Sequence, residues 1–351
     1  MTGSFDQPQD LSPRDAWQRY LDARSPETTS QSQQTYYYRL KLWVEWCEEN
    51  GIETVSELNG WIFESFKQAR SGQSLAPTTL QGEMQTLKNH IEFLERIEAV
   101  DEDLAEKVDV PHVAKRDQSS NVKLDSNDAT ALLNYFRESD AHRAQNYHAA
   151  LEVLWHVGAR MGGFRSLDLL DFHVDDELLD FNHRPETDTP LKKKEDGERM
   201  VGLRSSVVDV LIEYVANHRP NSHDDTGRQP LFATTHGRVS PSAFRAWCYY
   251  ATLPCHHGPC PHGKDPLSCS WVSNNEASKC PSSRSPHQVR TGSITWHRDR
   301  GVPREITAER TNASEDTIDK HYDKPLKRQS LERRRRPHLD KLSLEEDSDD
   351  E

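Results

Sequence analysis

Apolar side chains recur every three or four residues through the first hundred positions of the chain, which is the spacing of one face of an α-helix. Turn or capping residues divide this pattern into four helices, which open at Pro13, at Ser30 or Ser32, at Thr54 and at Thr78-Thr79. The polar stretch 1–12 lacks the periodicity, and we expect it to be disordered. The pattern therefore predicts a small all-helical domain over residues 13–107.

Residues 108–124 combine turn formers and charge with little periodicity, so we interpret them as a linker. Beyond the linker, helical periodicity alternates with short segments of strand character, at 172–174, 178–182 and 199–203. A Lys-rich connection joins the last two. We predict a mainly α fold with a small antiparallel β-sheet, in two domains, of which residues 125–335 form the second, an α+β domain.

Charge is unevenly distributed along the 351 residues. The 44 basic and 58 acidic residues give a formal net charge of −14, yet basic residues outnumber acidic ones over 284–336, before an acidic tail at 336–351. A polyanion-binding face can lie on an acidic protein when its cations are clustered. An acidic exterior also fits a proteome adapted to high salt. The chain has no apolar run of membrane length and no signal-peptide pattern, so we expect a cytoplasmic protein without a membrane partner.

Five of the six cysteines lie between Cys248 and Cys280, in or beside an insertion rich in Pro, Gly and Ser at about 253–283. Without a secretion signal, such a cluster favours a metal site or a redox cluster over a disulfide framework. The candidate ligands of a structural zinc ion are Cys255, Cys260, Cys269 and Cys280. Four thiolates would close the zinc shell, which argues against a catalytic metal. Their spacing is wider than in common zinc knuckles, and the alternative is a disordered loop with chance cysteines.

Four further features carry candidate chemistry, although each has an ordinary structural interpretation when taken alone. Arg160 follows a predicted helix beside three glycines, where the backbone can approach an anion and a guanidinium can bind it. The lysines at 192–194 belong to the hairpin connection. His287 and Arg290 begin a helix and lie one turn apart. Tyr322, late in the chain, could attack a phosphate if a proton acceptor and cations surround it, because its free pKa is about 10.

The order of these features resembles the tyrosine recombinases, the phage-integrase-like or Xer-like family. Ser166 to Phe172, after Arg160, is similar to the leucine-rich run that follows the family's first arginine. Gly301-Val302-Pro303 is similar to the step that precedes the family's tyrosine segment. The helical first domain resembles the family's core-binding domain, so the resemblance covers about residues 14–330. The Cys/His insertion is not part of the common pattern and resembles an elaboration of haloarchaeal members.

The resemblance implies a site-specific DNA recombinase or integrase that works through a 3′-phosphotyrosine. Tyr322 would be the nucleophile, Arg160 and Arg290 would clamp the phosphate, and His287 would help to move the tyrosine proton. Lys194, with Lys192 as the alternative, would protonate the leaving 5′-oxygen. The reaction would need no cofactor. The implied partners are double-stranded DNA with a specific site and three further copies of the chain, which form a tetramer on two duplexes.

Three positions depart from the family pattern. Gly163 stands where the family has an acidic residue, and Thr291 stands where it usually has His. Asn312 falls near the position of a His or Trp about ten residues before the tyrosine; an Asn can donate a hydrogen bond to a phosphate oxygen but cannot carry a proton. These departures motivate one alternative, a catalytically inactive DNA-binding protein of the same fold. A zinc-stabilised scaffold that binds a protein partner is the other.

Overall fold

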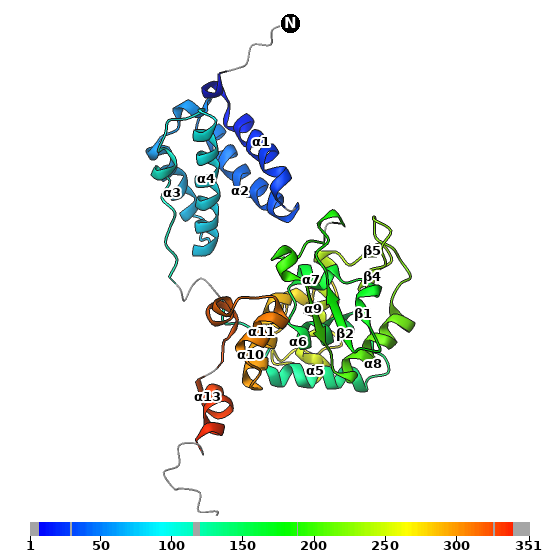
Figure 1. The fold of residues 1–351 in the computed structure, drawn as a ribbon. Coiled ribbons are helices and arrows are strands. Elements are labelled where there is room, and N and C mark those ends of the chain that lie inside the picture. The colour runs from blue at the N-terminus through cyan, green and yellow to red at the C-terminus, as the bar shows by residue number, and fades with distance from the viewer. Residues whose placement is uncertain (1–6, 29, 115–119, 188, 326, 340–351) are drawn as a thin grey trace, which may run out of the picture. The chain divides into compact units, whose positions relative to one another are not determined.

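The structure is a computed structural model that describes residues 7–28, 30–114, 120–187, 189–325 and 327–339 (Figure 1). The chain divides into two compact units, Met1–Ser120 and Asn121–Glu351. Helices dominate both units, and the short strands all belong to the second. The predicted fold class, mainly α with a small antiparallel sheet, is therefore confirmed.

The first unit is built from the four predicted helices: α1 (Pro13–Arg24), α2 (Ser30–Glu49), α3 (Gly60–Ser71) and α4 (Pro77–Arg96). Helix α4 contacts the other three. The stripe positions of these helices are buried in one core, in which Trp43 stacks on Trp46 and contacts Phe63 and Phe66. The apolar periodicity thus predicted this unit because each helix buries one face against its neighbours.

Three expectations about the ends of these elements were wrong. The third helix begins at Gly60 instead of Thr54, because Asn59 accepts the N–H groups of Trp61 and Ile62 and Thr54 caps a separate 3₁₀ turn, Val55–Glu57. The fourth begins at Pro77, so that the threonines at 78 and 79 lie inside its first turn.

The third wrong expectation concerns the disordered stretch 1–12. Residues 1–6 lie outside the described part of the chain, but Pro8–Asp10 form a 3₁₀ turn. The side chain of Leu11 is buried and its carbonyl accepts the N–H of Val55 at 2.9 Å. The Gln9 side chain also donates to the Glu98 carbonyl oxygen at 2.6 Å. One apolar anchor and two long-range hydrogen bonds therefore order residues 7–12, whose composition predicts disorder.

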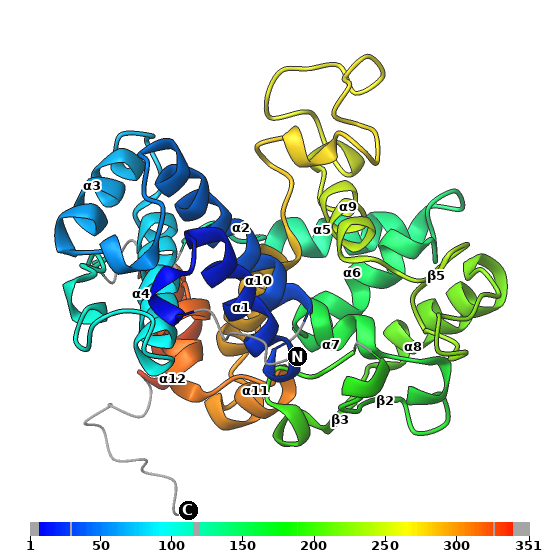
Figure 2. The same ribbon diagram turned by 90° about the horizontal axis from the view of Figure 1, so that it is seen from above.

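In the second unit, helix α6 (Asn146–Val157) lies at the centre, and nine of its residues are buried. It contacts α5 (Ser126–Glu138), α8 (Ser205–Glu213), α9 (Pro241–Ala251) and α10 (Pro286–Asp299) (Figure 2). A helix that is apolar on most of its surface is expected inside a core. The short helix α7 (Met161–Ser166) follows α6, with Gly162 and Gly163 inside it.

The three-stranded sheet has the order β1 (Phe172–His173), β2 (Leu178–Phe181) and β3 (Arg199–Gly202), and both pairings are antiparallel. All three strands were predicted. A second ribbon, β4 (Ala233–Thr234) and β5 (Gly237–Arg238), was not predicted: both of its strands are only two residues long, and neither pairs with a longer strand among the described residues. Its turn requires Gly237, which has a φ of 98° and whose added Cβ would meet the His223 carbonyl oxygen at 2.6 Å.

The end of the described chain is made of short helices. Helix α11 (Arg304–Thr311) and α12 (Glu315–Thr317) lead to a π-helical turn, Ile318–Tyr322. Helix α13 (Lys327–Ser330) continues into a second π-helical turn, Leu331–Arg335, and a 3₁₀ turn, Arg336–His338. Most of the predicted acidic tail, residues 340–351, lies outside the described residues.

Candidate active site

The start of helix α10 sets two of the predicted side chains on one face. Ser285 caps the helix by accepting the N–H of Gln288, and Gln288 Oε1 accepts the N–H of Ser285 at 2.9 Å. Pro286 occupies the first helical position, where no intrahelical N–H is needed. This capping box fixes where the helix begins, and His287 and Arg290, three residues apart, therefore share a face.

Arg290 is a buried cation with unused donors. Its side chain is 1% exposed, and Nη1 donates to the carbonyl oxygens of Gly158 and Thr311, the latter at 2.7 Å. Nε and Nη2 are buried and have no hydrogen-bond partner among the described residues. Burial lowers the pKa of Arg290 to about 10, and the nearby charge of Arg160 acts in the same direction. Buried donors are almost always paired, so this guanidinium calls for an anion.

Arg160 reaches the same place from another part of the chain. Helix α6 ends at Gly158 in the left-handed conformation, with a φ of 67°, and Arg160 follows as the N-cap of α7. Its Nη1 donates to the carbonyl oxygen of Asn312. A side chain at Gly158 would also meet Ser293 Oγ and Thr311 Cγ2 at 3.0 Å. Gly158 therefore allows the end of α6 to pack closely on α10 and α11. As a result, both arginines donate to the backbone at the end of α11, Arg290 to Thr311 and Arg160 to Asn312.

Tyr322 lies directly against this pair of cations. The Cζ atom of Arg290 lies 4.6 Å from the centroid of the Tyr322 ring, and the ring centroid of His287 lies 5.4 Å from it. Tyr322 ends the π-helical turn Ile318–Tyr322, a geometry that is rare and frequent at functional sites. Tyr322 thus lies beside Arg290 and His287 of the same chain, and its side chain is 5% exposed.

His287 is suited to accept a proton. Burial lowers its pKa below the ordinary value, and the positive charges of Arg290, Arg160 and His321 lower it further. A neutral imidazole at physiological pH has one nitrogen free to accept a hydrogen bond.

The backbone around Tyr322 is held by contacts on both sides. The hydroxyl of Thr295 donates to the Tyr322 carbonyl oxygen at 3.0 Å and accepts the N–H of Lys324 at 3.2 Å. Arg334 donates to both carboxylate oxygens of Asp323, at 2.7 and 2.8 Å, and its Nε donates to Asp299 at 2.7 Å. The segment beyond the tyrosine is therefore tied back to α10.

Arg199, which was not among the predicted site residues, adds a further cation close to Arg290 and Arg160. Arg199, on β3, stacks over the Phe181 ring with its Cζ 4.1 Å from the centroid and donates from Nε to the Arg310 carbonyl oxygen at 2.9 Å. Burial and the charges of Arg290, Arg160 and Arg310 lower the pKa of Arg199 to about 9. The signal in the sequence was an arginine that alternates with exposed Met200 on a half-buried strand.

Lys194 lies in the connection between β2 and β3, and the end of this connection contacts Asn312. Lys194 is exposed and starts a 3₁₀ turn that ends at Gly197; Lys192 is exposed as well. A Cβ added at Gly197 would lie 2.6 Å from Asn312 Nδ2, so the end of this turn packs on the Asn312 side chain. Asn312 takes the left-handed conformation that caps α11, with a φ of 53°, which Asn tolerates better than most residues. Both lysines therefore lie on an exposed connection whose end contacts Asn312.

The other two departures from the family pattern have local roles. Thr291 is buried, and its hydroxyl donates to the His287 carbonyl oxygen at 2.9 Å, within the helix. Gly163 packs against Leu191 and Phe181, whose side-chain atoms would lie 3.7 Å from an added Cβ. An acidic side chain at this position would face apolar neighbours.

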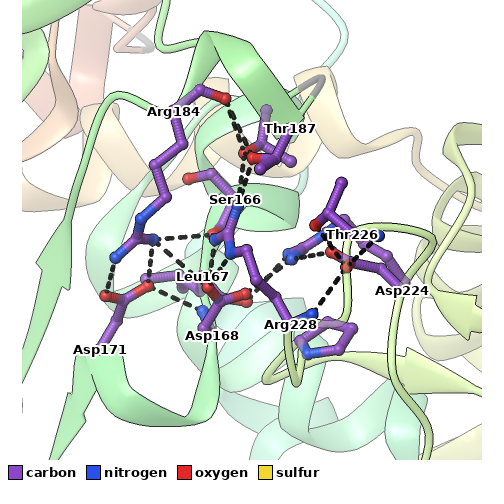
Figure 3. A network of polar contacts seen from close by, with 12 residues as sticks. Ser166, Leu167, Asp168, Asp171, Arg184, Thr187, Asp224, Thr226 and Arg228 are labelled. Atoms are coloured by element: carbon purple, nitrogen blue, oxygen red, sulfur yellow. Dashed lines mark hydrogen bonds and ion pairs between the residues drawn. The ribbon is translucent and has the colours of Figure 1, made fainter.

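A buried ion network fixes the segment that follows Arg160 (Figure 3). Asp168 pairs with Arg228 and, at 2.6 Å, with Arg238, while Arg184 donates to both oxygens of Asp171 at 2.6 and 2.7 Å. Figure 3 shows the Arg184 and Arg228 side chains converging on the two aspartates from opposite sides. Because α7 ends directly before this network, the network holds in place the helix that Arg160 begins.

The four predicted zinc ligands, Cys255, Cys260, Cys269 and Cys280, lie in the connection between α9 and α10, and none forms a disulfide. In the described parts of the chain, no group of three or more Cys, His, Asp or Glu side chains is already arranged to hold a metal ion.

Comparison with solved structures places the fold. Over 95% of its length the chain is similar to the integrase of the transposon Tn1549 in complex with a circular intermediate DNA, with a TM-score of 0.65, 12% identity and all of that chain covered. Over 89% of its length it is similar to lambda integrase bound as a dimer to a core site, with a TM-score of 0.60, 9% identity and 77% of that chain covered.

A further match concerns the sequence. A segment that makes up 29% of the chain is 50% identical to 97% of the N-terminal domain of a phage integrase/site-specific recombinase from Haloarcula marismortui, with a TM-score of 0.29. The chain belongs to the tyrosine recombinases. No family profile and no curated protein matches it. Among the described residues of this tyrosine recombinase, no helix is both long enough and apolar enough to span a membrane.

Proposed function

We propose that this tyrosine recombinase is a site-specific recombinase or integrase that cuts and rejoins DNA through a 3′-phosphotyrosine intermediate. The observation that supports it most is the buried Arg290, with two unpaired nitrogens, directly above the Tyr322 ring. Arg160 and His287 border the same point. An uncharged ligand would leave these cations uncompensated, whereas a phosphodiester supplies one negative charge shared by two non-bridging oxygens, both of which accept hydrogen bonds.

In the proposed first step, Tyr322 Oη attacks the scissile phosphorus. The new P–O bond joins the tyrosine to the 3′ side of the nick, and the bond to the 5′-oxygen breaks. Negative charge grows on the non-bridging oxygens in the transition state, where Arg160 and Arg290 would stabilise it. His287, whose lowered pKa keeps it neutral, would take the tyrosine proton or orient the phosphate.

The leaving 5′-oxygen needs a proton. Lys194, or Lys192 in its place, would donate it from the exposed connection between β2 and β3. A 5′-hydroxyl of a second strand then reverses the attack and releases the tyrosine. Each step exchanges one phosphodiester-type bond for another, so neither a nucleotide nor a metal cofactor is needed. Because each active site cuts one strand, exchange between two duplexes would use four copies of the chain. Such a protein would act in the cytoplasm, on chromosomal or mobile DNA.

The test is a suicide substrate, a duplex with a specific site and a nick placed so that the short 5′-hydroxyl fragment diffuses away after cleavage. The full chain should form a covalent protein–DNA adduct that is stable in denaturing gels. Tyr322→Phe should abolish the adduct and keep DNA binding, while Tyr249→Phe, a matched hydroxyl deletion on α9, should keep both. No adduct from a preparation that binds the site would refute the proposal.

The second candidate is a DNA-binding protein of this fold that no longer cuts, and Asn312 favours it. The family has His or Trp at this position, whereas Asn312 cannot carry a proton and its side chain packs on Gly197. Binding without an adduct would support this candidate. If Asn312→His increases adduct formation in a weakly active protein, the asparagine limits catalysis without preventing it.

A further inference from the structure

The connection between α9 and α10 is an insertion that is closed at its base. The hydroxyl of Thr252, at the end of α9, accepts the N–H of Arg284 at 2.7 Å and donates to the Arg284 carbonyl oxygen at 3.3 Å. Arg284 Nε also donates to the carbonyl oxygen of Lys123 at 3.1 Å. Residues 253–283 therefore leave and return at one point, immediately before the helix that carries His287 and Arg290.

The interior of this insertion is too small to order it by apolar burial. Its buried apolar residues are Leu253, Ala277 and Cys280, with Trp271 and Val272 partly buried beside them. Three apolar side chains supply a few kcal/mol when they are buried, whereas ordering each residue costs about 1–2 kcal/mol in backbone entropy. Small modules with so little core are usually held together by a metal or by disulfides.

Cys260 lies in a turn that is shaped for a metal-bound thiolate. The N–H of Gly263 donates to the Cys260 carbonyl oxygen at 3.1 Å, and Gly263 has a φ of 65°. The backbone N–H groups of His262 and Lys264 both donate to the Cys260 sulfur. The thiol of Cys255 is hydrogen-bonded to the same sulfur. Backbone N–H groups aimed at a sulfur are the outer-shell partners that stabilise a ligating thiolate.

The other two cysteines of the insertion begin similar turns. The N–H of Val272 donates to the carbonyl oxygen of Cys269, and the N–H of Ser283 donates to that of Cys280, each at 3.1 Å. Three of the four cysteines of the insertion, Cys260, Cys269 and Cys280, therefore stand at the start of a turn closed by a backbone hydrogen bond.

The four thiols lie near one another. The sulfurs of Cys260, Cys269 and Cys280 are all close enough to that of Cys255 to interact with it. None of the four is in a disulfide. As thiolates they would repel one another without a cation between them.

Two of the three histidines in the insertion have other contacts. His256 packs among Phe136, Tyr135 and Tyr250, and its Nε2 is hydrogen-bonded to the Tyr250 carbonyl oxygen at 2.9 Å. His262 Nε2 is hydrogen-bonded to Ser282 at 3.0 Å, and its ring lies at the edge of Trp271. The four thiols are therefore the larger set of candidate metal donors in the insertion.

We propose that Cys255, Cys260, Cys269 and Cys280 bind one structural Zn²⁺ ion that orders the insertion. Soft thiolates select zinc among the common divalent cations, and four of them make a closed tetrahedral site without catalytic chemistry. The side chains do not surround a common point as they stand, so binding requires Cys269 and Cys280 to turn toward the Cys255–Cys260 pair. The ion would join the two ends of the insertion, at Cys255 and Cys280, to its middle, at Cys260 and Cys269, next to the base that Thr252 and Arg284 close.

The experiment measures the metal content of the full chain, purified without chelators, by mass spectrometry of the elements. We expect about one zinc per chain for the wild type and for Cys47→Ala, which removes a thiol from the other unit. Cys260→Ser and Cys269→Ser should each lower the content at least about fivefold. Replacing zinc with Co²⁺ should give the intense visible bands of tetrahedral cobalt thiolate, a signal that does not depend on any variant folding.

Three results would overturn the site. One is a wild-type zinc content below about a tenth per chain after growth with zinc. Another is the same zinc content in Cys260→Ser as in the wild type. The third is a Cys255–Cys260 disulfide in protein alkylated directly from cells, because a redox pair cannot hold the metal. None of these readouts uses DNA cleavage, so the zinc site and the proposed recombinase function can fail independently.

Discussion

The contact between Arg334 and Asp323, the residue after Tyr322, predicts that Arg334→Ala destabilises the second unit and slows adduct formation. Arg334→Ala removes three charge-assisted hydrogen bonds, two to Asp323 and one to Asp299. Asp299 is 4% exposed, so the substitution leaves a buried carboxylate short of its main partner. Arg333, 3.8 Å from Asp299, compensates in part.

The size of the effect follows from these contacts. Breaking one side of a buried ion pair costs about 3–5 kcal/mol. Arg334 and Asp323 are 18% and 15% exposed, and Arg333 remains, so we expect a loss of about 2 kcal/mol in the free energy of unfolding of the second unit. For a unit of roughly 200 residues this lowers Tm by about 4–8 °C. The Tyr322 turn also loses one of its two ties to α10, and the adduct rate should fall about tenfold, the effect of about 1.4 kcal/mol on a barrier.

The assay combines thermal unfolding with single-turnover adduct formation, well below the lowered Tm. Arg335→Ala is the matched control, because Arg335 lies on the same π-helical turn and is exposed. Arg334→Lys should recover part of the stability and little of the rate, since an ammonium cannot pair with both oxygens of Asp323. If Arg334→Ala matches Arg335→Ala in both measurements, the tie does not position Tyr322 and the reasoning is refuted.

Two further predictions concern the site itself. Arg290→Lys should lower the single-turnover adduct rate at least about 100-fold with little change in DNA affinity. The reason is that one ammonium group cannot bind the Gly158 and Thr311 carbonyl oxygens and a phosphate at the same time. The control is Arg245→Lys, because Arg245 is exposed on α9. Burial and the neighbouring cations lower the pKa of His287, so its imidazole should take up a proton only at a lower pH than an unperturbed histidine does. The adduct rate should therefore fall in a more acidic range than a free imidazole would give, and His287→Gln should remove that fall. A His287-dependent fall centred at or above the pKa of a free imidazole, about 6.5, would contradict the lowered pKa.

The sequence was sufficient where local rules determine structure. The helices of the first unit follow from periodicity, and the cap at Ser285 follows from the Ser-Pro-x-Gln pattern that places His287 and Arg290. Periodicity did not decide between two competent caps, Thr54 and Asn59, because the choice depends on which turn packs in the core.

The candidate site was predictable only as an order of residue types. That Arg290 is buried with unpaired nitrogens depends on the crossing of Gly158 over Thr311, which no spacing reveals. The tie made by Arg334 was hidden for a similar reason: in the sequence it is one of four consecutive arginines, and only the tertiary structure separates it from exposed Arg335.

The same distinction between buried and exposed cations bears on how an acidic chain could act on a polyanion. Attraction between exposed charges is screened within about 3 Å in 1 M salt, whereas buried groups are screened much less. Arg290 is buried and Arg199 is partly buried, so their effect on a bound phosphate should persist in salt that weakens the encounter with DNA. Salt should therefore act mainly on the affinity for the site, with its counterion-release slope, and much less on the rate of adduct formation once DNA is bound. A bound-state rate that falls as steeply with salt as the affinity would mean that exposed cations, and not this pocket, hold the scissile phosphate.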